Sequence, residues 1–233
     1  MIKLENTEVL GWEHAIRGMR NPKNSWDRSD SSWIDFENWN CGHGVPDGMG
    51  NAFVIGKNDH KLMVNLASGG PVHAKYRRMI TVYVDITAPL YWWKEYDTYK
   101  VGTVANSCST MHKIHAKEFT LEDFSCEHLF DEYERHTTDD CDYLLTLRIV
   151  IDQLNDARNR FLETKDKDYW WQMIQLLPSS YNQKRTVMLN YEVLAGIYPM
   201  RKDHKLDEWR EFCTWVESLP YSELITGYEN KES

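Results

Sequence analysis

A strand that runs directly into an aromatic helix constrains the fold of this chain more than any other segment. Over residues 79–88, β-branched side chains alternate with others at period two, which predicts a strand with one apolar face. That face carries Ile80, Val82, Val84 and Ile86. Pro89 then begins a predicted helix over residues 89–100, because the fixed φ of proline suits the first helical turn. The apolar face of such a strand has to be covered by other elements.

Apolar residues at helical spacing mark most of the remaining chain. We expect further helices over residues 12–20, 58–70, 142–164, 168–177, 182–198 and 206–219. Apart from segment 79–88, only the first residues of the chain favour a strand or turn. These proportions predict an α+β fold that is rich in helices and contains a small sheet.

The 233 residues contain no internal repeat and no low-complexity segment. This length is ample for a hydrophobic core without disulfides or a metal, and we expect one domain over residues 1–233. Residues 21–51 are rich in Pro, Gly, Asn, Asp and Ser and interrupt the helical pattern. Irregular segments of that length often serve as lids or binding loops.

Charge and composition argue against several classes of protein. The 27 Lys and Arg residues against 36 Asp and Glu residues give a net charge of −9, opposite to the basic surface that binds nucleic acids. No apolar run is long enough to span a membrane. The acidic residues Glu5 and Glu8 stand where an export signal would carry basic and then apolar residues. The five cysteines are odd in number and lack a CxxC pair, which fits reduced thiols without a structural disulfide. We therefore expect a cytoplasmic protein without nucleic-acid or membrane partners.

Tryptophan and tyrosine are unusually frequent, with 10 and 13 copies. On the predicted helix after Pro89, residues 92, 96 and 99 fall on one face. These rings can form a wall on which a planar ligand stacks, or they can pack in the core, which is their more common use.

The order of these segments resembles the flavin-dependent thymidylate synthases. In the first half of the chain, the matching features are the turn at residues 66–70, His73, the strand, the aromatic helix, the triplet Thr98-Tyr99-Lys100 and the Ser-rich segment 106–109. In the second half, they are the Leu177-Pro178 turn, Asn190 and the segment 200–203. The match covers most of the chain, with insertions near residues 21–51 and 113–140.

The resemblance implies a helix-rich domain around a small antiparallel sheet, and it implies roles for particular residues. Those implied to bind the cofactor are His73, Tyr99, Lys100 and Asn190. Those implied to bind the substrate are Glu95, Ser107, Ser109, Thr110 and Arg201, with Arg201 also implied as catalytic. Where the family carries an Arg-His-Arg flavin motif, this chain carries Thr98-Tyr99-Lys100, so one positive charge remains.

The chemistry of these side chains fits such roles and also simpler ones. Lys100 and Arg201 could bind a ligand phosphate, because an ammonium supplies charge and a guanidinium matches phosphate oxygens. The hydroxyls of the NSCST segment could donate to the same phosphate. Surface ion pairs and an ordinary Ser/Thr turn are the alternatives. Asn190, expected on an apolar helix, needs partners from the protein or from a ligand.

The activity implied by the resemblance is the methylation of dUMP to dTMP. Methylenetetrahydrofolate supplies the carbon in that family, reduced flavin takes part in its transfer, and a nicotinamide nucleotide reduces the flavin, so the implied cofactors are FAD, methylenetetrahydrofolate and NADPH. A site shared between subunits implies a homo-oligomer, in this family a tetramer. The alternative is a nucleotide-binding relative that has lost the flavin and is non-catalytic or has altered chemistry.

Two other kinds of site remain as minor alternatives. Cys108, His112, His115, Cys126 and His128 are of the types that ligate zinc, but their spacing matches no common zinc pattern. Cys108 with His112 nearby could also be a nucleophile and its base. The Pro-Cys signature of the folate-only thymidylate synthases is absent. We expect no metal site.

Overall fold

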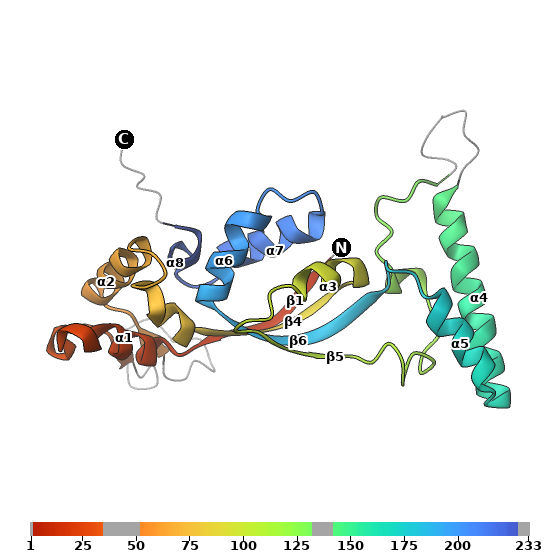
Figure 1. Ribbon diagram of the computed structural model, residues 1–233, viewed down its shortest axis with the longest axis horizontal. Coiled ribbons are helices and arrows are strands. Elements are labelled where there is room, and N and C mark those ends of the chain that lie inside the picture. The colour runs from red at the N-terminus through yellow and green to blue at the C-terminus, as the bar shows by residue number, and fades with distance from the viewer. Residues whose placement is uncertain (1, 35–51, 132–141, 228–233) are drawn as a thin grey trace, which may run out of the picture. The chain divides into compact units, whose positions relative to one another are not determined.

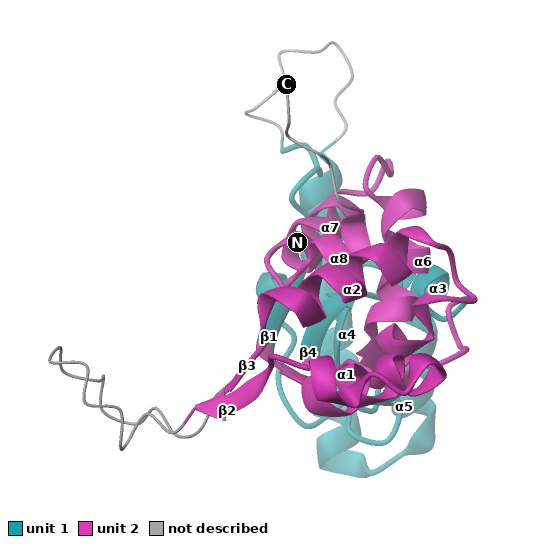
Figure 2. Ribbon diagram, turned by 90° about the vertical axis from the view of Figure 1, so that its left-hand side faces the viewer, with its two compact units in different colours: residues 1–5, 85–98, 105–187 teal, residues 6–84, 99–104, 188–233 magenta. Residues whose placement is uncertain are grey.

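The computed structural model describes residues 2–34, 52–131 and 142–227 (Figure 1). Its internal contacts divide the chain into two compact units (Figure 2). Unit 1 comprises residues 1–5, 85–98 and 105–187, and unit 2 comprises residues 6–84, 99–104 and 188–233. The assignment of residues 1–233 to a single domain stays a prediction.

The main sheet has four strands in the order β1-β4-β6-β5. Their bounds are Lys3–Leu10 for β1, Thr81–Pro89 for β4, Asn182–Asn190 for β6 and Val104–Ser107 for β5. The pairing of β4 with β6 is antiparallel, since the Leu90 amide donates to the Tyr181 carbonyl (3.0 Å) and the Tyr191 amide donates to the Ile80 carbonyl (3.1 Å). The helix-rich α+β fold with a small antiparallel sheet is therefore confirmed.

Strand β4 has the apolar face that its sequence predicts. Ile80, Val82, Val84 and Ile86 are each at most 1% exposed. The helix that follows, α3 (Leu90–Tyr96), is shorter than predicted, because the Thr98 hydroxyl and amide both bond the Glu95 carbonyl and end it. Tyr99 lies beyond the helix, so the prediction that residues 92, 96 and 99 share a helical face was wrong.

The segment predicted as a helix over residues 182–198 is instead a strand followed by a helix. Burial along β6 has period two near its end, where Val187 and Leu189 are fully buried. The helix α6 (Tyr191–Arg201) begins only after Asn190, whose side-chain oxygen accepts a hydrogen bond from the Val193 amide (3.1 Å). Asn190 is therefore a helix cap at the end of a strand and not a residue within an apolar helix.

Unit 1 contains the helices α4 (Tyr143–Thr164) and α5 (Lys167–Leu176), which pack as a pair, and a short 3₁₀-helix at Leu121–Asp123. Asp142 and Asp166 cap the two longer helices. Their apolar faces enclose a core of Ile114, Phe119, Phe124, Leu147, Ile151, Leu154, Ala157 and Met173. The helices predicted over residues 142–164 and 168–177 are thus confirmed within one residue. Part of the predicted insertion 113–140 contributes to this core.

Unit 2 holds the remaining helices. They are α1 (Trp12–Arg20), α2 (Lys57–Ser68), α6, α7 (Asp207–Glu217), α8 (Glu223–Thr226) and the 3₁₀-helix η4 (Ala74–Met79). The first part of the predicted irregular segment 21–51 forms two 3₁₀-turns, Asn21–Lys23 and Trp26–Arg28, and the strand β2 (Ser32–Ile34), which pairs antiparallel with β3 (Ala52–Val54). Residues 35–51 lie outside the described part of the chain. No helix within the described ranges is long and apolar enough to cross a membrane.

Gly11 sets the turn between β1 and α1. Its φ of +93° is a conformation that favours glycine, and a Cβ there would lie 2.1 Å from the Met79 carbonyl oxygen. The chain can therefore enter α1 beside η4 only with glycine at this position.

A buried ion pair anchors residues 20–31 to α2. The Asp59 carboxylate is fully buried and accepts hydrogen bonds from the Arg20 Nε (2.6 Å) and from the hydroxyls of Ser29 (2.7 Å) and Ser31 (2.6 Å). The Arg20 guanidinium also donates to the backbone carbonyls of Ser25 and Arg28, both at 3.0 Å. The start of this segment is therefore held by satisfied hydrogen bonds.

Burial alone would raise the pKa of Asp59, but hydrogen bonds from Ser31, Ser29 and Arg20 outweigh burial and hold the pKa below its usual value. We predict that Asp59→Asn lowers the free energy of unfolding by about 3 to 5 kcal/mol, because it leaves the Arg20 charge buried without its counter-ion. Denaturant unfolding at neutral pH measures this loss.

Since the folded-state pKa of Asp59 is depressed, its contribution is present above the usual carboxylate pKa and disappears as pH falls through the folded value. The difference in unfolding free energy between wild type and Asp59→Asn should therefore become smaller at acidic pH. The matched control is Asp156→Asn, which breaks a pair with Arg160 in which both side chains are more than half exposed, and it should change stability little. Equal effects of the two substitutions would contradict a special role for Asp59.

Candidate functional site

In unit 2, Arg201 at the end of α6 is held between two aromatic rings. Its Nε donates to the Tyr99 hydroxyl (2.8 Å), and its guanidinium carbon lies 4.5 Å from the centre of the Trp209 ring and 5.5 Å from that of Tyr99. Trp209 is fully buried, so the stacking surface is rigid. Such contacts favour a single orientation of the guanidinium.

The loop 99–104 reaches α6 near both of its ends. Tyr99 contacts Arg201 at the C-terminus, and Gly102 lies against the N-terminus, where a Cβ would come within 3.0 Å of Val193 and 3.3 Å of the Asn190 Nδ2. The φ of Gly102 is +80°, so glycine is required there for both space and conformation. Of the predicted site residues, Tyr99 and Arg201 are therefore in contact at the C-terminal end of α6, whereas Asn190 lies at its opposite end, beside Gly102.

Two further predicted residues of unit 2 have exposed side chains. Lys100 lies in the same loop as Tyr99, and His73 lies at the start of η4, next to Gly69. Both can reach a ligand from solvent. Nearby, Arg77 donates to Glu192 (2.8 Å) and to the Leu224 carbonyl (2.9 Å), so its charge is neutralised inside the unit.

The predicted substrate residues Glu95, Ser107, Ser109 and Thr110 lie in unit 1. Ser107 ends β5 and is exposed, and Thr110 and Glu95 are half-buried. The Ser109 hydroxyl accepts hydrogen bonds from the amides of Met111 (3.2 Å) and His112 (2.8 Å), as in an ordinary Ser turn. This is the alternative to ligand binding that the sequence left open.

Most of the aromatic helix packs in the core. Trp92, Trp93 and Tyr96 are at most 2% exposed and contact one another with ring centres 4.9 to 5.3 Å apart. Their rings pack within unit 1, so for these residues core packing, the more common use of such rings, is confirmed over a stacking wall for a ligand.

Sequence reasoning missed Arg185 in β6. Its guanidinium carbon lies 4.0 Å from the centre of the Trp93 ring, and it bonds Asp97 and Gln183. The residue stood in a segment predicted as helix. The signal that could have identified Arg185 in the sequence was its positive charge in the segment that follows the Leu177-Pro178 turn.

The alternative metal site gains no support from the described residues, whereas the thiol site, Cys108 with His112 nearby, stays a prediction. Among the described residues, no three His, Cys, Asp or Glu side chains cluster as metal ligands. The three described cysteines, Cys108, Cys126 and Cys213, are free thiols. Burial raises the pKa of Cys126, and it raises the pKa of Cys213 to about 11, which disfavours both as nucleophiles. Cys41 and Cys141 lie outside the described residues.

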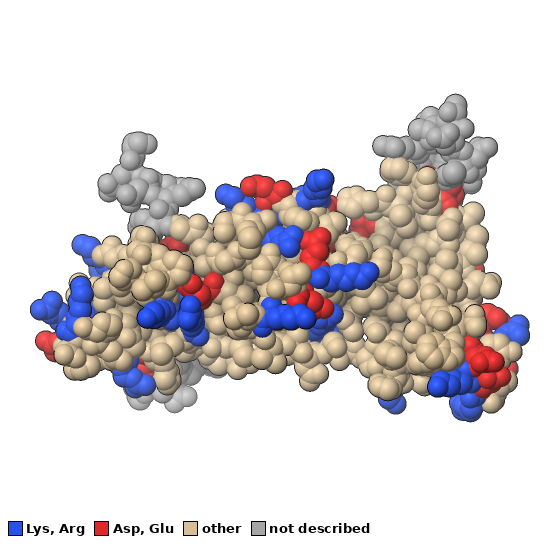
Figure 3. All heavy atoms as spheres, in the orientation of Figure 1, with Lys and Arg blue, Asp and Glu red and all other residues tan. Residues whose placement is uncertain are grey.

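Charges of both signs are interspersed on the face shown in Figure 3, where Lys and Arg atoms are blue and Asp and Glu atoms are red. This distribution, together with the net charge of −9, differs from the basic stripe that a nucleic-acid-binding surface needs.

No family model matches the sequence, and no curated protein matches it. Solved structures, however, match the whole fold. Thymidylate synthase X from Helicobacter pylori, solved with FAD and dUMP, has a TM-score of 0.62 and 13% identity over 97% of both chains. The UMP/dUMP methylase PolB from Streptomyces cacaoi, solved with 5-Br dUMP, has a TM-score of 0.59 and 11% identity over 98% of this chain and 95% of that chain.

The chain therefore has the fold of the flavin-dependent thymidylate synthases. The resemblance that the sequence motifs carry is confirmed at the level of the fold. At these identities the fold alone is shared, and the activity has to be argued from the site.

Proposed function

We propose that the protein is an enzyme that methylates a pyrimidine nucleotide, dUMP or a close relative. The fold supports this proposal, because the two similar proteins named above were solved with dUMP or with a bromo-substituted analogue. Methylenetetrahydrofolate as the carbon donor and NADPH as the reductant belong to the same proposal.

The observation that carries the proposal is the arrangement of Arg201. A guanidinium held by Tyr99 and Trp209 loses little side-chain entropy when it binds an anion, and its planar set of donors suits phosphate oxygens or a pyrimidine carbonyl. Binding energy of this kind orients the substrate, which is the main task of a protein whose chemistry a cofactor supplies.

The residues at the implied flavin positions do not form a charged cradle for FAD. Thr98 bonds the Glu95 carbonyl, the Tyr99 hydroxyl accepts from Arg201, and the Asn190 oxygen caps α6. Lys100 is the single cation of the triplet 98–100. A flavin diphosphate would therefore meet fewer charge-assisted hydrogen bonds here than an Arg-His-Arg motif provides.

That mismatch favours a second candidate function. A nucleotide-binding relative that retains Arg201 but has lost the flavin would have the same fold and would show no methylation, or it would carry out different chemistry. The two candidates share the nucleotide site and differ in the cofactor.

We predict that Arg201→Ala weakens dUMP binding roughly 30-fold or more, because a charge-assisted contact worth about 2 kcal/mol or more is lost. Arg201→Lys should recover part of the affinity, since it keeps the charge without the planar set of donors. Calorimetric titration of dUMP measures both effects. Loss of the aromatic stacking should also lower stability by about 1 to 2 kcal/mol.

Arg210→Ala is the matched control, because Arg210 is an exposed arginine of the same unit that pairs with Asp207. It should leave dUMP affinity unchanged. Unaltered affinity in Arg201→Ala, or no measurable dUMP binding by the wild type, would remove the assignment of Arg201.

Titration with FAD separates the two candidate functions. The methylating enzyme should take up FAD with a dissociation constant below about 100 μM, with bound-flavin absorbance and quenched fluorescence. Lys100→Ala should weaken that uptake, whereas Lys75→Ala, which removes another exposed lysine of the same unit, should not. Absence of FAD uptake together with intact dUMP binding would favour the second candidate.

A site shared between subunits predicts an oligomer. We expect a mass by light scattering well above the 27.6 kDa of the monomer, and four times that value for a tetramer. A monomer at micromolar concentration would count against a shared site.

A further inference from the structure

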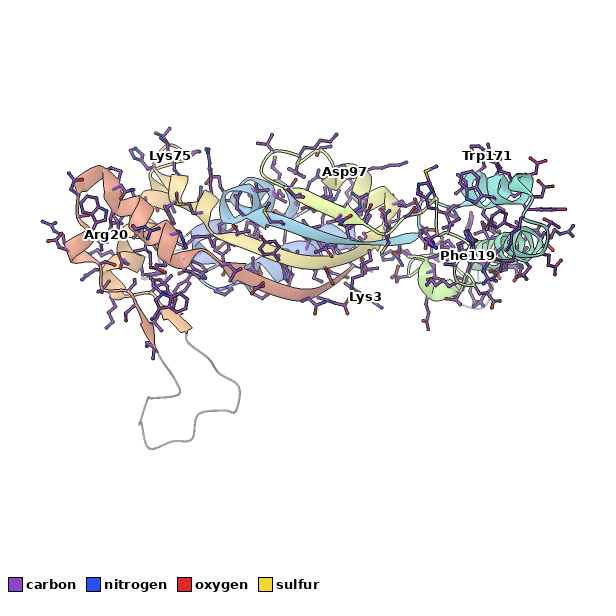
Figure 4. All side chains as sticks on the ribbon, turned by 90° about the horizontal axis from the view of Figure 1, so that it is seen from below. Lys3, Arg20, Lys75, Asp97, Phe119 and Trp171 are labelled. Atoms are coloured by element: carbon purple, nitrogen blue, oxygen red, sulfur yellow. The ribbon has the colours of Figure 1, made fainter. Side chains whose placement is uncertain are left out.

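Arg185 is held in one orientation inside unit 1. Its Nη1 donates to an Asp97 carboxylate oxygen (2.7 Å), its Nε donates to the Gln183 side-chain oxygen (3.0 Å), and its guanidinium lies over the Trp93 ring at 4.0 Å. The side chain is 15% exposed, and Trp93 is itself fixed by a hydrogen bond from its Nε1 to the Gln183 carbonyl (2.9 Å). Figure 4 labels Asp97, which follows α3.

The second terminal nitrogen of this guanidinium, Nη2, has no hydrogen-bond partner within the described ranges of the chain. Its carboxylate partner, Asp97, is 49% exposed, so solvent weakens the neutralisation of the charge. Arg185 therefore combines a fixed position with unused donors.

The same group lies beside the Ser-rich segment. The Gln183 side-chain amide donates to the Cys108 carbonyl (2.8 Å), and the Cys108 amide donates to the Lys184 carbonyl (2.9 Å). In an antiparallel pair this bond places Cys108 opposite Lys184, and Ser107 therefore opposite Arg185 on the same face of the sheet. An exposed hydroxyl and a guanidinium are thus cross-strand neighbours.

We propose that Arg185 and Ser107 bind the phosphate group of the nucleotide. The identity of the ligand as a nucleotide rests on the proposed function, but the anion site itself rests on the geometry of Arg185. A guanidinium and a hydroxyl donate to adjacent oxygens of a phosphate, and the orientation fixed by Trp93 reduces the entropy lost on binding.

A purely structural role for Arg185, as a cover for Trp93, makes different predictions. Packing over Trp93 requires the carbon chain and the flat guanidinium of Arg185, and it does not require the unused N–H donors. Asp97 distinguishes the two roles. In a phosphate site its carboxylate repels the ligand, and replacing it by Asn keeps a hydrogen-bond acceptor for Arg185 while removing the repulsion.

The test compares the binding of dUMP, deoxyuridine and inorganic phosphate by calorimetry. Arg185→Gln should weaken the binding of dUMP at least tenfold and leave the binding of deoxyuridine unchanged, because only dUMP carries the phosphate. Arg185→Lys should weaken dUMP binding less than Arg185→Gln does, and Asp97→Asn should strengthen dUMP binding. Arg160→Gln is the control, since it removes an exposed arginine of the same unit, and it should change nothing.

Unchanged dUMP affinity in Arg185→Gln, or an equal loss for dUMP and deoxyuridine, overturns the proposal, and so does weaker phosphate binding in Asp97→Asn. If wild type does not bind dUMP but binds inorganic phosphate in an Arg185-dependent way, the anion site stands and the proposed function fails. If neither ligand binds to wild type, both are overturned. Thermal unfolding of each variant shows whether a loss of binding comes from a loss of fold.

Discussion

The antiparallel pairing of β4 with β6 determines where the functional elements begin. Each of these strands runs directly into a helix, β4 into α3 and β6 into α6. The hydrogen bonds at the two ends of the pair, from Leu90 to Tyr181 in unit 1 and from Tyr191 to Ile80 in unit 2, set the first residue of each helix. In unit 1 this places Asp97 and Trp93 beside Arg185. In unit 2 it places Arg201 one helix length beyond Asn190.

The two candidate binding residues follow one physical pattern. Arg201 and Arg185 each have the guanidinium over a buried tryptophan and a hydrogen bond from Nε to a polar side chain. Stacking on an indole favours the charge and restricts its rotation, so the arginine is ordered before a ligand arrives. An exposed lysine such as Lys100 has no such restriction and loses more entropy on binding.

The sequence predicted β4 and most helices because their patterns are local and complete. Every second residue from Ile80, which directly precedes β4, to Ile86 is apolar, and Asp142 is a recognisable cap for α4. For β6 the pattern failed, since Lys184, Arg185 and Thr186 interrupt the alternation and the apolar residues of α6 follow without a break. Tertiary pairing, which propensity does not report, decided this segment. Arg201 could be found through the resemblance, whereas Arg185 depends on Asp97, a contact across 88 residues of sequence.

We propose that the protein binds a pyrimidine nucleotide through a fixed guanidinium group, that of Arg201 or that of Arg185. A crystal structure of the protein with 5-iodo-dUMP tests it most directly, because anomalous scattering from iodine locates the pyrimidine independently of the surrounding density. We expect an iodine peak in an ordered ligand that lies within hydrogen-bond distance of Arg201 or Arg185. A ligand ordered elsewhere on the chain, or both guanidinium groups without ligand at saturating 5-iodo-dUMP, would contradict it.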